Sequence, residues 1–242
     1  MKEKILLIIP AYNEEKVIKE VYDGIIDYNK KNKTKYDVIV INDGSKDDTE
    51  KILMQNNIPH IKLIHNLGIG GAVQTGYKYA LENDYDIAIQ FDGDGQHNIE
   101  YAKTLIEPII NNEADLVIGS RFIDKNSSGF KSTFARLIGI RLISSFIKLT
   151  TRKRIYDCTS GFRACNKRTI EHFSHTYPTE YPEPVSSVDL FKNKYTIKEV
   201  PVSMNERKEG TSSIKSYKKA YYMINVILSI FVLWLRGDNN EW

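Results

Sequence analysis

Residues 87–98 of this 242-residue chain read I-A-I-Q-F-D-G-D-G-Q-H-N, an apolar run that breaks abruptly into two carboxylates. The apolar part predicts a buried strand, and the alternating Asp and Gly residues predict a turn at its carboxyl end. In open α/β sheets, ligands bind along that edge. Asp92 and Asp94 offer hard oxygen ligands, so they are candidates to hold a divalent ion that already carries substrate phosphates. An isolated D-x-D is more often a solvated turn, so this interpretation depends on the rest of the chain.

The pattern of short apolar runs separated by helical stretches extends on both sides of this turn. It predicts a mostly parallel sheet with right-handed crossovers, flanked by helices. Strands are expected at 4–9, 36–41, 61–64, 87–91, 116–118 and, at an edge because of Pro201, 195–202. Ser45 and Asp48 have the spacing of a capping box for the helix that follows them. The glycines at 68–71 predict a loop before a helix that begins at Ala72, and the prolines at 176–184 predict an irregular loop.

Composition narrows the classes of protein to consider. The length suits one α/β domain with a large core. The formal charge of +3 is too small to indicate nucleic-acid binding, but residues 131–154 carry seven basic and no acidic side chains, which predicts a local basic patch. The two cysteines give no disulfide framework, and the first residues lack the apolar segment of a secretory signal, so a cytoplasmic setting is expected.

Two stretches have the character of membrane-surface helices. Residues 133–149 predict a helix with an apolar stripe beside a basic one, which suits either an anionic membrane or an ordinary packed surface helix. Residues 221–235 are apolar nearly all round, but as a helix they would cover only about 22 Å. That is short of the hydrocarbon core of about 30 Å. We therefore expect this segment to lie in the membrane interface or to dock on a small membrane-protein partner.

Several motifs, in order, carry a resemblance to a known family. They are P-A-Y-N-E at 10–14, N-D-G-S at 42–45, N-L-G-I-G-G at 66–71 and D-G-D-G-Q-H at 92–97, supported by S-R-F at 120–122, T-S-G-F-R-A at 159–164 and E-R-K-E-G-T-S-S-I at 206–214. Together they resemble family 2 glycosyltransferases of the GT-A fold, and most of all the polyprenyl-phosphate sugar transferases of the dolichol-phosphate mannose synthase type. The resemblance implies a GT-A catalytic domain over 1–212, divided into a nucleotide-sugar half (1–120) and an acceptor half (121–212), followed by an apolar segment over 213–242.

The resemblance also implies roles for individual residues in binding the donor. Asp43 would meet the base or ribose, for which a carboxylate is a suitable acceptor of neutral donors. Asp94, with Gln96, would hold Mg²⁺ or Mn²⁺ against the diphosphate, and Asp92 would face the donor sugar or ribose. His97 is expected to be a turn residue without a catalytic role. The other positions expected to contact the nucleotide sugar are Pro10, Ala11, Tyr12, Glu14, Gly71 and Gly93.

Catalysis is expected to involve Asp92 together with charged residues of the second half, and acceptor binding to involve cations of the second half. Arg207, with Lys208 as the second choice, would disperse charge on the leaving diphosphate. A polyprenyl phosphate is already ionised near neutral pH and needs mainly cations to hold it. Arg121, Arg136 and Arg141 are the candidates, because guanidinium groups match phosphate oxygens. Asp157 is expected to act as a base or to orient the sugar, and Arg163 to pair with it or with phosphate.

The sequence leaves several alternatives open. The leading hypothesis is an inverting, metal-dependent transferase from a UDP- or GDP-sugar to a polyprenyl phosphate, bound peripherally at the cytoplasmic membrane face. A second is transfer to a hydroxyl of a lipid-linked glycan, with Glu183 or Asp189 as base, since residues 180–184 depart from the dolichol-type pattern. A third is a non-catalytic nucleotide-sugar-binding subunit. A Rossmann oxidoreductase is disfavoured because the G-x-G of 68–70 lacks its third glycine and does not follow the first strand. A homo-oligomer stays open.

Overall fold

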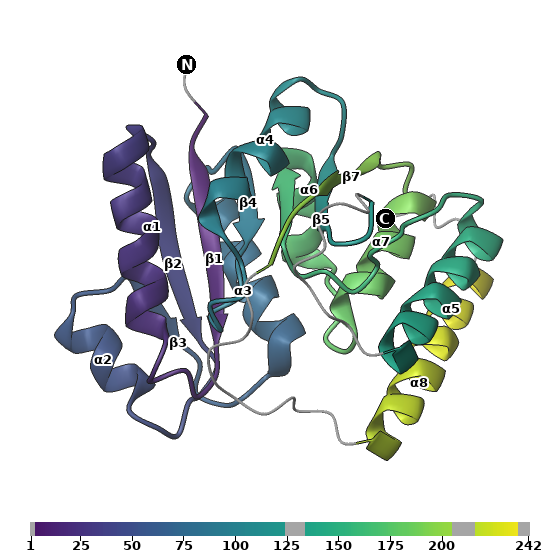
Figure 1. The fold of residues 1–242 in the computed structure, drawn as a ribbon, viewed down its shortest axis with the longest axis horizontal. Helices are drawn as coiled ribbons and strands as arrows, with labels where there is room; N and C mark the ends of the chain where they lie inside the picture. The colour runs from purple at the N-terminus through teal and green to yellow at the C-terminus, as the bar shows by residue number, and fades with distance from the viewer. Residues whose placement is uncertain (1–2, 124–133, 205–215, 237–242) are drawn as a thin grey trace.

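The computed structural model describes residues 3–123, 134–204 and 216–236, with the side chains of all of these except 134–136 and 216–220. Its centre is a seven-stranded sheet in the order β3-β2-β1-β4-β6-β5-β7 (Figure 1). The strands are β1 (Ile5–Ala11), β2 (Tyr36–Asn42), β3 (His60–Lys62), β4 (Ile87–Gln90), β5 (Leu116–Ser120), β6 (Arg163–Asn166) and β7 (Ile197–Pro201). All pairings are parallel except those of β6 with β4 and β5. The predicted mostly parallel sheet, with its last strand at an edge, is confirmed.

Helices cover both faces of this sheet because successive strand residues point to opposite sides. On one face, Ile5, Leu7 and Ile9 of β1 pack with residues of α1 (Ile18–Asn32), α2 (Thr49–Gln55) and α4 (Ala102–Ile110), the last preceded by a short 3₁₀ turn, η1 (Ile99–Tyr101). On the other face, Leu6 and Ile8 pack with residues of α3 (Gly68–Glu82), α6 (Lys167–His175) and α7 (Pro182–Lys192). Each strand therefore contributes to two separate cores, which explains its nearly continuous apolar sequence.

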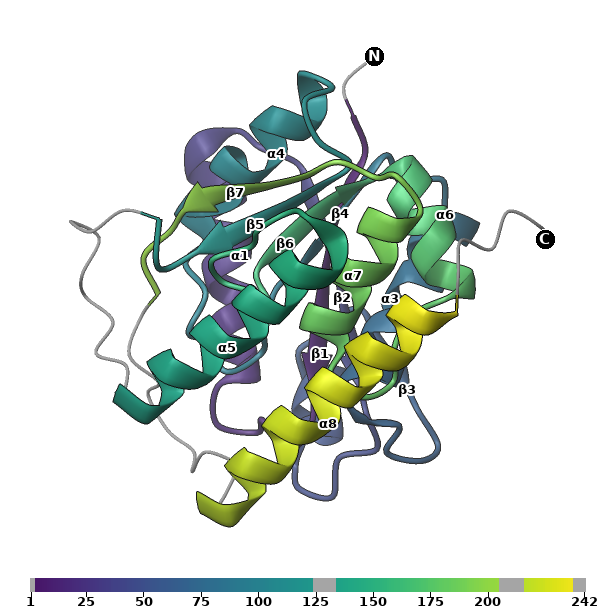
Figure 2. The same ribbon diagram turned by 90° about the vertical axis from the view of Figure 1, so that its right-hand side faces the viewer.

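Two further helices, α5 (Phe134–Thr151) and α8 (Ser216–Leu235), lie side by side and pack on α7 (Figure 2). Gly139 of α5 allows their close approach, since a Cβ there would lie 2.9 Å from the sulfur of Met223. Ile140, Ile143 and Ile147 form the buried side of α5. The predicted apolar stripe is a different one: Ile138, Leu142 and Leu149 are exposed, Leu149 by 76%.

The C-terminal helix α8 likewise keeps a large apolar surface in solvent while burying Val226 and Ile230. The exposed side chains are Tyr221, Ile224, Leu228, Phe231, Val232, Trp234 and Leu235. Among the helices of the described residues, none combines the length and the apolar character needed to cross a bilayer.

Three local predictions were wrong. Ser45 does not cap α2, which begins at Thr49 without a side-chain cap, because the Ser45 hydroxyl accepts the backbone N–H of Asn13 instead. Helix α3 begins at Gly68 and not at Ala72. The loop predicted for 176–184 ends early, since Pro182 occupies the first turn of α7, where its missing N–H costs no hydrogen bond.

Candidate active site

The carboxyl ends of β1, β2 and β4 lie together at one edge of the sheet, where the strand order reverses direction between β1 and β4. The predicted donor-binding positions after these strands are therefore neighbours in space. A Cβ at Gly93 would lie 3.1 Å from the carbonyl oxygen of Pro10, so glycine lets the loop after β4 approach the end of β1. A crevice at such a reversal is the usual ligand site of an open α/β sheet.

The loops after β1 and β2 are joined by hydrogen bonds between side chains and backbone. The backbone N–H of Asp43 donates to the carbonyl of Ala11 at 2.9 Å. Asn13, at a positive φ of 58°, accepts the backbone N–H of Lys46 at 2.8 Å, and the backbone N–H of Glu14 donates to the Thr49 hydroxyl at 2.9 Å. Tyr12 between them is exposed. These bonds hold four predicted donor-binding residues, Ala11, Tyr12, Glu14 and Asp43, in one fixed arrangement.

Asp43 is buried, and its carboxylate caps the start of α3. Its two carboxylate oxygens accept the backbone N–H groups of Leu67 at 2.7 Å and Gly68 at 2.9 Å. Burial raises the pKa of this carboxyl, and the two backbone hydrogen bonds oppose that rise. Gly71 lies in the same first turn, where a Cβ would lie 2.5 Å from that of Leu67. Each carboxylate oxygen keeps a second lone pair for a base or ribose donor, so the predicted contact with the nucleotide remains a prediction.

The loop after β4 presents the two predicted metal and sugar carboxylates. Asp94 is 8% exposed, and its Oδ1 accepts the backbone N–H of Gln96 at 3.0 Å. Gly95 has φ +75°, a conformation that favours glycine and that turns the chain at this point. Asp92 keeps about a third of its side chain exposed (34%). Its carboxylate faces Gly161, where a Cβ would lie 3.0 Å from Oδ2.

His97, predicted as a turn residue without a catalytic role, lies beneath this loop and is buried. Its Nδ1 accepts the backbone N–H of Asp92 at 2.9 Å, and its Nε2 lies 3.4 Å from Oδ2 of Asp92. The ring stacks on Phe162 and meets Phe91 edge-on. Burial lowers the pKa of His97, against the opposing charges of Asp92 and Asp94, so the imidazole is neutral near pH 7.

A second polar cluster lies behind Asp92. Gln90 is fully buried, and its amide nitrogen has no hydrogen-bond partner of ordinary geometry. It faces the carboxyl of Glu183 at the start of α7, whose pKa is raised by burial and lowered by the charge of Arg163. Arg163 itself is buried and donates to the hydroxyls of Ser186 and Ser187 and to backbone carbonyls of 158 and 160. Gln90 was not among the predicted site residues, because a single polar residue in a strand has no distinguishing pattern.

Arg121 and Asp157 form a buried, two-pronged ion pair. The Arg121 Nε and Nη2 donate to the two Asp157 oxygens at 2.7 Å each, and their side chains are 5% and 0% exposed. Glu199 of β7 accepts the backbone N–H groups of Tyr156 and Asp157 at 2.8 Å, and burial raises its pKa. The sequence indicated neither the pairing nor Glu199. Asp157 occupies the side of the Arg121 guanidinium that was expected to meet an acceptor phosphate. Asp157 therefore pairs with Arg121 and not with Arg163, which was the expected partner.

The other predicted cations lie farther along the chain. Arg141 is exposed on α5, beside the exposed apolar stripe of that helix. Arg136 lies in the first turn of α5, but its side chain is outside the described part. Arg207 and Lys208 also lie outside the described residues.

The residues of the loop after β4 fit a divalent ion that arrives with its substrate. Within the described ranges, no cluster of three or more His, Cys, Asp or Glu side chains is arranged to enclose a metal. Mg²⁺ commonly takes one or two protein carboxylates and completes its coordination with water and phosphate oxygens. Asp94 and Gln96 supply oxygen ligands of that kind. This donor set suits an ion shared with a diphosphate better than one held by protein alone.

Comparisons with known proteins identify a family model and relatives that match most of this chain. Residues 6–173 match the family model described as "Glycosyl transferase family 2". The UDP-N-acetylglucosamine–dolichyl-phosphate N-acetylglucosaminyltransferase of Methanococcus voltae is 36% identical over 84% of this chain and 86% of its own length. The undecaprenyl-phosphate mannosyltransferase of Micrococcus luteus is 27% identical over 92% of each chain.

A similar fold is found among solved structures. Glucosyl-3-phosphoglycerate synthase of Mycobacterium tuberculosis, crystallised with Mn²⁺ and UDP-glucose, superimposes with a TM-score of 0.68 at 18% identity, covering 98% of this chain and 81% of that one. At this identity the likeness concerns the fold alone. The predicted GT-A fold is confirmed.

Proposed function

The chain belongs to glycosyl transferase family 2, and we propose that it moves a sugar from a nucleoside diphosphate to a polyprenyl phosphate. The observation that carries the proposal is the loop after β4, which brings Asp92 and Asp94 to the sheet edge beside Ala11 and Asp43. The relatives named above for dolichyl and undecaprenyl phosphates support the acceptor class. UDP or GDP is the donor nucleotide.

In the proposed mechanism the acceptor supplies its own nucleophile. An oxygen of the polyprenyl phosphate attacks the anomeric carbon, the bond from that carbon to the diphosphate oxygen breaks, and the configuration inverts as the nucleoside diphosphate leaves. A phosphate oxygen carries negative charge at neutral pH and needs no proton removed. This suits Asp157, whose two oxygens are already bonded to Arg121 and which therefore orients the site instead of acting as a base.

Binding of the donor is divided among the loops after β1, β2 and β4. Asp43 and Glu14 meet the nucleoside, Asp94 and Gln96 hold a Mg²⁺ or Mn²⁺ ion, and Asp92 meets the sugar. When bound, the ion supplies positive charge against the diphosphate leaving group. Arg207 would add a second positive charge there, and Arg136 and Arg141 would hold the acceptor phosphate.

The acceptor is tested by incubating the protein with labelled UDP- and GDP-sugars, Mn²⁺ and vesicles containing a polyprenyl phosphate. We expect an acid-labile lipid carrying a single sugar. The second candidate, transfer to a glycan hydroxyl, rests on Glu183, a buried carboxyl beside Asp92 that would serve as base. Labelled product found only on a lipid-linked oligosaccharide would favour that alternative.

The role of Asp94 is tested by the Asp94→Ala variant. Loss of its carboxylate should abolish metal-dependent stabilisation by the nucleotide sugar, because a ligand of the folded state raises the melting temperature only while it binds. Asp27→Ala is the matched control, since Asp27 is an exposed helix carboxylate paired with Lys30. Unchanged turnover in Asp94→Ala would contradict the proposed metal site.

Peripheral attachment to the cytoplasmic membrane face follows from the same proposal. The exposed apolar side chains of α5 and α8 adjoin exposed cations of α5 and the residues after it: Arg141, Lys148, Arg152, Lys153 and Arg154. A surface that is apolar and basic suits anionic lipid. Leu228→Glu on α8 should reduce flotation with anionic vesicles, whereas Ile64→Glu, at an 89% exposed site of the first half, should not. Equal flotation of both variants would contradict this attachment.

A further inference from the structure

The contacts of His97 are concentrated on one residue, Asp92. The imidazole Nδ1 accepts the Asp92 backbone N–H at 2.9 Å, and Nε2 lies 3.4 Å from the Asp92 Oδ2. An imidazole nitrogen that accepts a hydrogen bond carries no proton, so the proton of the neutral ring is on Nε2 and is directed at the carboxylate. One side chain thus fixes both the backbone and the carboxylate orientation of Asp92.

The ring of His97 is itself held firmly. It stacks on Phe162 with centroids 4.6 Å apart and an interplanar angle of 17°, and its side chain is 2% exposed. Phe162 follows Gly161, the residue whose missing Cβ leaves room for the Asp92 carboxylate. The carboxylate is therefore confined between the imidazole on one side and Gly161 on the other.

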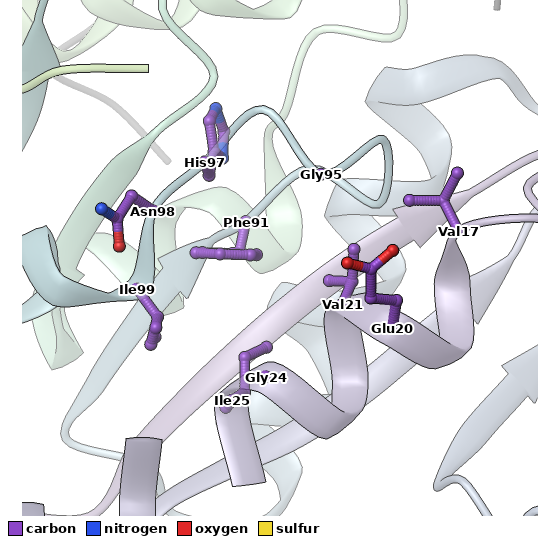
Figure 3. Close-up of a pocket in the computed structure, with 10 residues that line it drawn as sticks. All are labelled: Val17, Glu20, Val21, Gly24, Ile25, Phe91, Gly95, His97, Asn98 and Ile99. Carbon is purple, nitrogen blue, oxygen red and sulfur yellow. The ribbon is translucent and has the colours of Figure 1, made fainter. Parts of the chain in front are cut away.

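The opposite side of the loop is only partly packed, since a Cβ at Gly95 would lie 3.3 Å from Cγ1 of Val17. Figure 3 shows a pocket between the start of α1 and the loop, bordered by Val17 just before α1, by Glu20 and Gly24 on α1, and by Gly95 and His97 on the loop. The volume of this pocket is about 190 Å³. A loop that contains two glycines has a pliable backbone, and here α1 leaves space beside it. Contacts with His97 and its aromatic neighbours therefore add to the order that partial packing against α1 provides.

We propose that His97 is a positioning residue that sets the carboxylate of Asp92 for the donor sugar, which rests on the proposed function above. Partners that orient a ligating side chain typically change affinity or activity by about 10-fold to 100-fold when they are removed. The same range is expected for the donor KM when both contacts of His97 with Asp92 are lost, the hydrogen bond at Nδ1 and the 3.4 Å contact at Nε2. Substitution of His97 should change kcat less than it changes the donor KM, because within the described part of the chain the imidazole contacts no residue that is proposed to bind the acceptor.

Three substitutions separate the two contacts. His97→Phe keeps the stack on Phe162 and loses both the hydrogen bond at Nδ1 and the contact at Nε2. His97→Asn places an acceptor oxygen near the position of Nδ1 and should restore the bond from the Asp92 N–H. His97→Gln places an amide donor near the position of Nε2 and should restore the contact with the carboxylate. If His97→Phe fails to fold, the two amide variants still report on the two contacts.

The experiment combines amide hydrogen exchange at Asp92 with titration of the nucleotide sugar in the presence of Mn²⁺. We expect His97→Phe to speed exchange of the Asp92 amide and weaken the donor about 10-fold or more, and His97→Asn to recover both in part. Exchange of the Asp92 amide at the unaltered rate in His97→Phe would overturn the proposal, as would faster exchange with unchanged donor affinity. If the unaltered protein binds no nucleotide sugar, the proposed function is overturned. If exchange of the Asp92 amide still depends on His97 in that case, the contact between the two residues stands on its own.

Discussion

The two parts of the chain hold their polar groups in different ways. In residues 3–120 the polar side chains at the sheet edge bond mainly to backbone N–H groups of neighbouring loops, as Asp43 does to Leu67 and Gly68. In residues 121–204 charged side chains are removed from water in pairs or clusters, as in Arg121–Asp157 and Arg163 with its serines. The first part depends on close backbone contacts and the second on compensation of buried charge, so each should be sensitive to a different kind of substitution.

The largest effect is expected from Asp157→Asn. This change leaves the Arg121 guanidinium buried beside a neutral partner, and removing one member of a buried pair costs about 3–5 kcal/mol of unfolding free energy. Urea unfolding followed by circular dichroism measures the loss. Asp27→Asn, which alters an exposed pair on α1, serves as the control and should leave the midpoint in place. Equal shifts in both variants would remove the distinction between the two parts.

A smaller loss is expected from Gly76→Ala in the first part. A Cβ at this position of α3 would lie 2.2 Å from Cγ2 of Ile8 on β1, so helix and sheet must separate to admit it. Overpacking of this kind costs about 1–3 kcal/mol. The same urea titration measures it. A neutral result would mean that α3 can move away from β1 without loss of packing.

The opposite sign is expected for Gly24→Ala on α1, where no atom lies within 4 Å of the added Cβ. Alanine in place of an exposed helical glycine should stabilise the protein by about 0.5–1 kcal/mol. Measured beside Gly76→Ala, this variant separates helix propensity from the fit of helix to sheet. Destabilisation by Gly24→Ala would show that the pocket beside α1 closes in solution.

The smallest effect is expected when the native protein is treated with a thiol reagent. Its two thiols, Cys158 and Cys165, both lie in the second part. Burial raises the pKa of Cys158 and of Cys165 to about 12, so both stay protonated at pH 8 and neither should react with a disulfide reagent in native buffer. The absorbance of the released thiol measures the reaction, and full reaction after denaturation is the control. Reaction at Cys158 while the first part remains folded would reveal local opening of α5, whose Ile140 carbonyl accepts the Cys158 thiol.

The sequence predicted most of the sheet because β1, β2, β4 and β5 lie in apolar runs with turn residues at their ends. It missed β6, which is no shorter than β4 but is centred on the pair Ala164 and Cys165 and begins with a buried arginine. A short segment of that composition becomes a strand only between two neighbours already in place. The start of α3 was placed too late for a similar reason, since the carboxylate that caps it belongs to Asp43, 25 residues before Gly68.

The sequence indicates residues of the candidate site where they are adjacent in the chain, and it does not indicate contacts between residues that are distant. The motif at 92–97 gives Asp92, Gly93 and Asp94 directly, and the structure places them beside Pro10 and Ala11. Arg121 and Asp157 are 36 positions apart, and no spacing rule relates them. Glu183 and Gln90 meet only because α7 packs behind β4. A motif shows which side chains are present, whereas their hydrogen-bond partners depend on the tertiary fold.

The position of β6 between β4 and β5 has a consequence for synthesis of the protein on the ribosome. Chains emerge from the N-terminus, at about 5–20 residues per second, so β4 is made long before its antiparallel neighbour. Ile87 pairs with Asn166, which means that 79 residues must be added before that edge of β4 is covered. Until then the nascent chain exposes unpaired backbone groups of an apolar strand, the kind of edge that recruits other strands. Nascent chains halted between β4 and β6 should therefore be the species that chaperones bind most strongly.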